Sequence, residues 1–417
     1  MRGKLISAAL LAIALSAGGA RADDAGIPGF ALSGFGTVGA VHSSLDTADF
    51  TGNSLKPNGA GFTHQWSADV DSLLAVQATA NLTPRLSVVL QVISEQNPDK
   101  TYRPHAEWAN IKYQFTPDFH VRVGRIGLPI FMISDSRKIG YSNPWVRPPL
   151  EVYNLVPVTN SDGIDASYRI PIGAATNTFQ ATAGRSDIKY PDTNGGDRIV
   201  TAKARDFVTL ADTFEHGFIT LRLNYGLGHV TINELDPLFD AFRQFGPQGE
   251  AIADKYNVNA RLIDFIGMGA SYDPGNWFVM GEWGRLKANS AIGDSSGWYA
   301  SAGYRFGKFT PYLTYGRTRR DSNSSDPGLD ASMLPPYLAG PAMSLNGALN
   351  SALANKVDQS TISAGGRWDL FRNVAFKLQY DYIRVGADST GMLRNTQPGF
   401  QLGSKLHVLS ATVDFVF

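Results

Sequence analysis

The sequence predicts an all-β fold, a transmembrane antiparallel up-and-down β-barrel of about 16 strands. Apolar and polar residues alternate with a period of two along many short segments. Tight turns and long connections follow each other regularly, and the final segment ends on a phenylalanine. We therefore divide the chain into a signal peptide, residues 1–22, and one barrel domain, residues 23–417.

The carboxyl-terminal segment gives the clearest pattern of alternation. One face would carry large or apolar residues and the other small or polar ones: Leu409, Ala411, Val413, Phe415 and Phe417 against Ser410, Thr412 and Asp414. The first face suits lipid and the second suits water. An edge strand of a soluble β-sandwich is the alternative interpretation of this segment alone.

Similar segments recur along the whole mature chain. The expected strands are 30–41, 66–82, 85–94, 105–116, 119–129, 162–172, 176–187, 199–214, 217–232, 255–272, 276–288, 297–307, 309–320, 357–369, 373–388 and 403–417. The short turns between them contain the Pro, Gly, Asn or Asp residues that turns require.

Long connections separate these hairpins at regular intervals. They are expected at 42–65, 95–104, 130–161, 188–198, 233–254, 289–296, 321–356 and 389–402. About eight long connections and about seven turns place both termini at the short-turn end, so the last strand can pair with the first and close the sheet. A two-sheet sandwich offers no reason for this alternation.

The amino terminus predicts export. Arg2 and Lys4 precede an apolar run from Leu5 to Ala17, and Ala20-Arg21-Ala22 forms a cleavage site. The run is too short to span a membrane as a helix. Elsewhere, apolar stretches are interrupted by Gly, Asp, Arg or Lys, so a membrane role requires a barrel.

Composition excludes several other classes of protein. Lys plus Arg and Asp plus Glu both total 37, which argues against nucleic acid as a partner. Cysteine is absent, so neither disulfides nor thiolate metal sites are available. The 43 glycines, 23 phenylalanines and 16 tyrosines suit tightly paired strands with aromatic girdles.

Signals for catalysis are weak. The seven histidines form no close-spaced ligand pair, and neither G-x-S-x-G nor H-E-x-x-H occurs. We expect no cofactor, no metal site and no enzymatic activity. The alternatives are a barrel enzyme of the lipase or protease type, with His105 or His229 beside a rim Ser or Asp, and a structural or adhesive barrel.

The opening strand Phe30 to Gly36, the strand from Val121 to Pro129, the long third connection and the ending at Phe417 together resemble the Gram-negative outer-membrane porins. The resemblance implies an outer-membrane channel for passive diffusion of small hydrophilic solutes or ions. It also implies a homotrimer, a third loop folded into the lumen as a constriction, and recognition of the last strand by the barrel-assembly machinery.

The third long connection is the candidate constriction. Its prolines and aromatic residues suit a packed loop rather than a floppy one. Charges of both signs in a low-dielectric wall would orient and filter solutes. The expected loop charges are Asp135, Arg137, Lys138, Arg147 and Glu151, and we expect Arg137 and Arg147 to contribute to ion preference.

Polar faces of the strands supply the expected lumen wall. Its charged residues are Lys112, Arg122, Asp165, Arg169, Lys203, Arg205, Arg222, Arg261 and Arg367. The basic excess predicts a weak preference for anions or carboxylate-bearing solutes; the alternative is that these arginines only pair with wall carboxylates. Arg125 is ambiguous, since strict alternation aims it at lipid unless a bulge or a position near the rim accommodates it.

Overall fold

The computed structural model describes residues 29–192, 198–354 and 357–417. The predicted signal peptide, residues 1–22, lies outside these ranges. Among the described residues, no helix is both long enough and apolar enough to cross a membrane.

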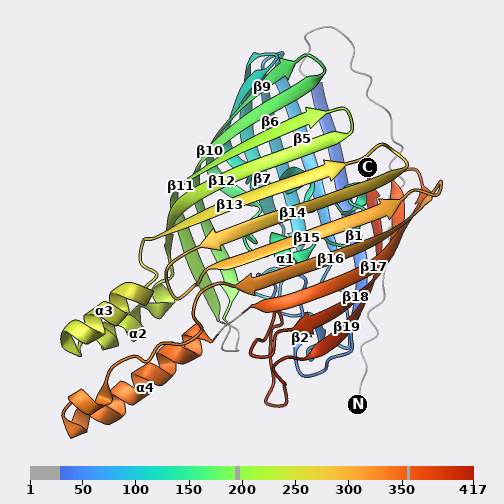
Figure 1. The fold of residues 1–417 in the computed structure, drawn as a ribbon. Coiled ribbons are helices and arrows are strands. Elements are labelled where there is room, and N and C mark those ends of the chain that lie inside the picture. The colour runs from blue at the N-terminus through green and yellow to red at the C-terminus, as the bar shows by residue number, and fades with distance from the viewer. Residues whose placement is uncertain (1–28, 193–197, 355–356) are drawn as a thin grey trace.

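The structure is a closed antiparallel barrel, as predicted (Figure 1). Its strands are β1 (Gly29–Ser43), β5 (Leu73–Thr83), β6 (Leu86–Glu95), β7 (His105–Thr116), β8 (Phe119–Gly127), β9 (Asn160–Ile172), β10 (Ala175–Pro191), β11 (Ile199–His216), β12 (Ile219–Thr231), β13 (Arg261–Tyr272), β14 (Trp277–Lys287), β15 (Ser295–Tyr304), β16 (Phe309–Arg320), β17 (Asp358–Phe371), β18 (Val374–Val385) and β19 (Lys405–Val416). Each strand pairs with the next along the chain.

Strand β1 closes the barrel by pairing with both of its neighbours. Residues 29–37 pair with β5, and residues 35–43 pair with β19. The backbone N–H of Phe417 donates to the carbonyl of Gly34 at 2.9 Å, and the N–H of Gly34 donates back to Phe417 at the same distance. The ladder therefore leaves no free edge at the junction of first and last strands.

The two faces of β19 separate as the alternation predicted. Leu409 and Val413 are each 38 % exposed on the outer surface, which lipid would cover. Ser410, Thr412 and Asp414 are almost completely buried on the inner side. The wall is therefore apolar outside and polar inside, which suits a barrel in a bilayer.

Aromatic residues collect on the outside near the short turns. Phe218, Trp277, Tyr304, Phe306 and Phe309 are all at least 40 % exposed there. The ring centroids of Tyr304 and Phe306 lie 4.5 Å apart. This belt marks the level of one membrane interface.

Two predicted strands start later than expected. The strand predicted at 66–82 begins at Leu73, and residues 66–67 form the short β4 (Trp66–Ser67) against β1. A second short pair, β2 (Asp49–Phe50) and β3 (Ala60–Gly61), lies within the first long connection. The strand predicted at 255–272 begins at Arg261, because a helix occupies the residues before it.

Three helices at the long-loop end were not predicted. They are α2 (Asp236–Arg243), α3 (Gly246–Tyr256) and α4 (Pro336–Leu353), and each begins with a proline at its first or second position. They extend from the barrel end together (Figure 1). Phe239 and Phe242 of α2 pack with Leu349 and Leu353 of α4 in one buried cluster, so the helices stabilise each other.

A β-bulge in β11 corrects two of the expected lumen residues. The register shifts between Arg205 and Val208, and Asp206 has a φ of 50°. The extra residue reverses the alternation beyond it. Ala204 therefore packs inward, whereas Lys203 and Arg205 face outward.

The seam between β1 and β19 gives a prediction about stability. A side chain added at Gly36 would collide with the ring of Phe415, which lies across it. We expect Gly36→Val to cost about 1–3 kcal/mol through this overlap. Semi-native electrophoresis after heating should show the folded barrel disappearing at a lower temperature. Val38→Ile, at an exposed outer position, is the control, and equal heat resistance of both variants would contradict the prediction.

Candidate pore and its constriction loop

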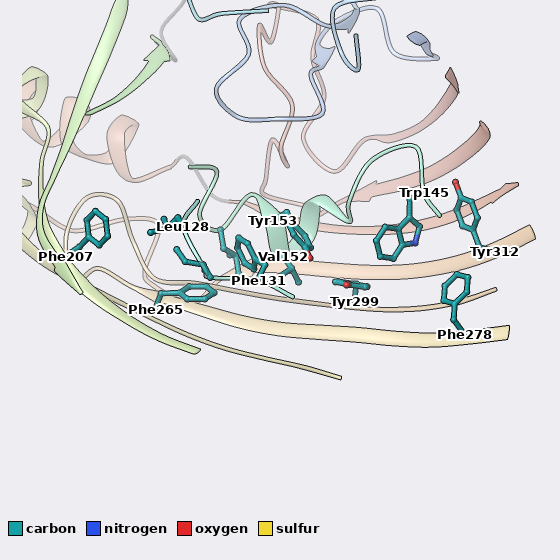
Figure 2. Close-up of a cluster of buried hydrophobic side chains, with 12 residues drawn as sticks. Leu128, Phe131, Trp145, Val152, Tyr153, Phe207, Phe265, Phe278, Tyr299 and Tyr312 are labelled. Carbon is teal, nitrogen blue, oxygen red and sulfur yellow. The ribbon is translucent and has the colours of Figure 1, made fainter. Parts of the chain in front are cut away.

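The third long connection folds into the barrel and packs along the inner wall, as Figure 2 shows. It contains two single-turn helices, η1 (Ser134–Ser136) and η2 (Gly140–Ser142), and the short α1 (Leu150–Tyr153). Phe131 meets Phe265 of β13 at 5.6 Å between ring centroids. Trp145 is 1 % exposed, and its indole N–H donates to Ser301 Oγ at 2.8 Å. This packing fixes the loop against β13–β16.

A close approach of backbones brings α1 to the wall. A methyl group on Gly297 of β15 would collide with the backbone oxygen of Glu151. Tyr153 is buried and donates from its hydroxyl to Glu282 of β14 at 2.5 Å. Tyr299 donates to the same carboxylate oxygen at 2.8 Å. The wall therefore combines a small residue and a polar anchor at the point where α1 lies.

Arg147 is the most extensively paired charge of the loop. Its guanidinium donates to both oxygens of Asp71, at 2.9 and 2.7 Å, and to Asp381 at 3.2 Å. It also donates to Ser410 Oγ at 2.7 Å. Burial alone would lower the pKa of Arg147, but the two carboxylates raise it well above its usual range. The residue stays charged and joins the loop to both sides of β1: to Asp71 just before β5, and to β18 and β19.

Lys138 forms a second ionic anchor. Its ammonium donates to Glu95 at 2.6 Å and to Glu107 at 2.9 Å. Desolvation by itself would lower the pKa of Lys138, whereas these two glutamates raise it above the ordinary value. The loop is thus tied to β6 and β7 as well as to the far wall.

Arg137 serves the loop's own fold. It donates to the backbone carbonyls of Tyr153 at 2.6 Å and Val156 at 3.1 Å. Its guanidinium also lies over the rings of Phe131 and Tyr153, 5.7 and 5.2 Å from their centroids. Burial lowers the pKa of Arg137 to about 10, so the group remains cationic at neutral pH.

Glu151 is buried on α1, and no described Lys or Arg forms an ion pair with it. Thr361 and Gln359 of β17 both donate to its Oε1. Burial raises the pKa of Glu151 above its ordinary value of 4.5, although these hydrogen bonds oppose the rise. The neutral form of the Glu151 carboxyl is therefore more favoured in this site than it would be in water.

Cations of the wall also hold the backbone of the loop. Arg367 donates to the carbonyls of Tyr141 and Asn143. Lys377 donates to the carbonyls of Gly140 at 2.6 Å and Trp145 at 2.7 Å, and its ammonium lies 3.0 Å from Asp414. Lys377 was not among the expected site residues. Only its position on the polar face of its strand could have indicated this role.

The remaining expected residues divide between the lumen and the rims. Arg122 pairs with the buried Asp165 at 2.8 Å. Arg222 donates to the carbonyl of Pro129 at 3.0 Å, and Asp135 is exposed on the loop. Arg169 pairs with Asp118 at the short-turn end, whereas Arg261 donates to backbone carbonyls at the end of α3.

Two wall cations, Lys112 and Arg222, make no ion pair with any described residue, although Arg222 donates to the Pro129 carbonyl. Lys112 lies beside Arg122 in the ladder between β7 and β8. Within the same described ranges, no group of three His, Asp or Glu residues could hold a metal ion. His105 lies 3.9 Å from Glu95, and His229 is exposed opposite Leu262 on the outer face.

The sequence was compared with known families, and residues 8–388 match the family model of the Gram-negative porins. The chain belongs to the Gram-negative porins. This porin is an outer-membrane channel, in agreement with its closed barrel and inward-folded loop. No curated protein sequence matched it significantly.

Solved structures share the fold at low identity. OmpF of Salmonella typhi in complex with daunomycin is 11 % identical, with a TM-score of 0.53 over 94 % of this chain and 100 % of that one. The channel DcaP of Acinetobacter baumannii is 12 % identical, with a TM-score of 0.54 over 94 % and 97 %. OmpT of Vibrio cholerae in its trimer form is 10 % identical, with a TM-score of 0.50 over 94 % and 100 %.

The clamp around Arg147 gives a prediction about conductance. Arg147→Met would leave Asp71 and Asp381 buried without their cation, which costs about 3–5 kcal/mol for such pairs. We expect the loop to detach, so single channels of the porin should show altered conductance and more current noise. Arg317→Met, at an exposed arginine 3.8 Å from Asp358, is the matched control. Quiet channels of unchanged conductance would show that this clamp does not hold the loop.

Glu151 gives a prediction about pH. Because its pKa is raised in the folded porin, ionisation opposes folding above about pH 4.5, the ordinary value, and this cost is absent at lower pH. Glu151→Gln mimics the neutral acid and should therefore resist heat better than the natural porin at pH 7.5 but not at pH 4. Heat inactivation followed at both pH values tests this.

Glu250→Gln, at an exposed position of α3, is the control for the loss of one carboxylate. It should leave heat resistance unchanged at both pH values. A gain from Glu151→Gln that is the same at pH 4 and pH 7.5 would contradict the titration argument.

Proposed function

We propose that this porin is a passive, water-filled diffusion channel for small hydrophilic solutes and ions, with a weak preference for anions or carboxylate-bearing solutes. One observation carries the ion preference: the cations of the third loop are paired or buried, whereas Lys112 on the wall has no ionic partner among the described residues. The preference would thus originate on the wall rather than on the loop.

The charges near the lumen support a small positive excess. Lys112, Arg122 and Arg222 lie on the polar faces of β7, β8 and β12, and Asp135 and Asp165 oppose them. Asp165 is fully buried, and it already accepts hydrogen bonds from Arg122 and Thr182. A modest excess of this kind favours anions without excluding cations.

We further propose that the porin performs transport without catalysis, assembles as a homotrimer, and is recognised by the barrel-assembly machinery through β19. The trimer form of the distantly similar OmpT supports the second point. The exposed apolar residues Leu409 and Val413 of β19, and Phe417 directly after the strand, support the third. No arrangement of His105 or His229 favours the alternative of a barrel enzyme.

Reversal potential in asymmetric potassium chloride tests the proposal. The natural porin in a planar bilayer should give stepwise conductance and a weakly anion-selective reversal potential. Lys112→Glu should make the potential cation-selective, because it replaces an unpaired wall cation with an anion. A silent bilayer with folded protein would refute the channel, and an unaltered potential would remove Lys112 from the filter.

Lys287→Glu is the matched control, since it makes the same charge change at an exposed outer position at the end of β14. It should leave the reversal potential unchanged. An equal shift in both variants would indicate a general surface-charge effect rather than a filter at Lys112.

A further inference from the structure

Arg125 lies on the outer face of the barrel, where its strict alternation with Val123 aims it. Val123 and Ile164 are 54 % and 48 % exposed on the same face. Arg125 is opposite Asp162 in the ladder of β8 and β9, and it donates to both oxygens of that carboxylate, at 2.7 and 2.9 Å. This pair therefore faces away from the channel lumen, which lies on the other side of the wall.

Arg125, Asp162 and a second arginine, Arg185, form a row across three neighbouring strands on the outer face. Arg185 of β10 is opposite Asp162 on its other side, so two guanidiniums flank one carboxylate. Arg185 is exposed and donates no hydrogen bond to any described residue. The row therefore carries a net positive charge and keeps unused hydrogen-bond donors that face away from the pore.

The outer surface beside the row is basic as well. Arg205 pairs with Asp187 at 2.6 Å, and Lys189 and Lys203 are exposed nearby on the same hairpin. Lys203 and Arg205 face outward because of the bulge in β11. Cations thus outnumber acidic residues along this part of the rim.

The row also borders a hollow in the outer surface. Small side chains at Ala106, Ala109 and Ala183 leave a shallow, open groove of about 680 Å³ beside Arg125 and Arg185. The lower part of the groove is lined by Val123 and Ile164, which are apolar. One groove therefore presents cations at one end and an apolar surface at the other.

The row lies at the level of the membrane interface at the long-loop end of the barrel. Asp162 lies ten residues from Ile172, the end of β9 at the short turn. With about 3.3 Å per residue and a tilt of about 40°, the row lies roughly 25 Å from that end along the membrane normal. The apolar band of such barrels is about 25 Å tall, so the row lies near its far edge. It is at the long-loop end, which faces the cell exterior in outer-membrane barrels.

We propose that this groove binds the phosphorylated headgroup of an outer-leaflet lipid, with Arg185 and Arg125 on the phosphate and the acyl chains along Val123 and Ile164. Guanidinium groups match phosphate oxygens in charge and geometry. A free phosphate ion would make no use of the apolar part of the groove. The site is separate from the pore, so it does not depend on the proposed ion preference.

Native mass spectrometry of the purified porin in detergent tests the site. The probes are diphosphorylated lipid A, phosphatidylcholine as a zwitterionic lipid, and inorganic phosphate as the headgroup chemistry alone. We expect lipid A to be retained and the other two not. Arg185→Ala should weaken lipid A binding by about tenfold, the scale of one charge-assisted hydrogen bond, and Arg185→Lys should restore part of it.

Arg305→Ala is the control, because Arg305 pairs with Asp273 at the opposite end of the barrel. Its side chain is 36 % exposed, close to the 37 % of Arg125 in the groove. It should bind lipid A as the natural porin does. Equal binding by Arg185→Ala and Arg305→Ala would overturn the proposal, as would equal retention of phosphatidylcholine or inorganic phosphate. A change of oligomeric state in Arg185→Ala with unchanged lipid binding would instead assign the groove to a second copy of the chain. Heat-modified mobility on gels verifies that each variant is folded.

Discussion

Closure of the backbone ladder by β1 is the constraint on which the rest of the structure depends. In a bilayer no water is available to satisfy a free strand edge, so each backbone N–H and carbonyl in the apolar band needs a partner. Strand β1 meets this need by pairing its first half with β5 and its second half with β19. Once the ring is closed, every strand has one face to lipid and one to the lumen, and all polar chemistry must be placed on the inner face or at the rims.

A second requirement is that the long third loop is held in one position inside the polar lumen. Cations of the loop form ion pairs with carboxylates of the barrel. Arg147 pairs with Asp71 and Asp381, and Lys138 pairs with Glu95 and Glu107. At Lys377 the cation belongs to the wall, and it donates hydrogen bonds to backbone carbonyls of the loop. Such pairs are costly to break because each would leave an uncompensated charge, so they specify one loop position rather than adding much net stability.

The barrel could be predicted from the sequence because its periodicity is local, and the ranges predicted for most strands agree with the structure. The helices α2, α3 and α4 were missed because they bury their apolar residues against one another across about 100 residues, and neither long connection shows that partner by itself. The bulge at Asp206 was missed for a related reason. One inserted residue leaves no mark in composition, yet it moves Lys203 and Arg205 to the other face. The loop charges were found, but their wall partners lie far away in sequence.

The strand β8 shows how little separates the two environments of this porin. Arg122 and Arg125 are three residues apart, yet alternation directs the first to Asp165 in the lumen and the second to Asp162 on the outer face. An arginine on the outer face is tolerated only where water and headgroups are near, which requires a position close to the end of the strand. The neighbouring Val123 remains at the apolar level. The same two-residue period that makes the wall of a pore therefore also determines where the outer surface can carry charge.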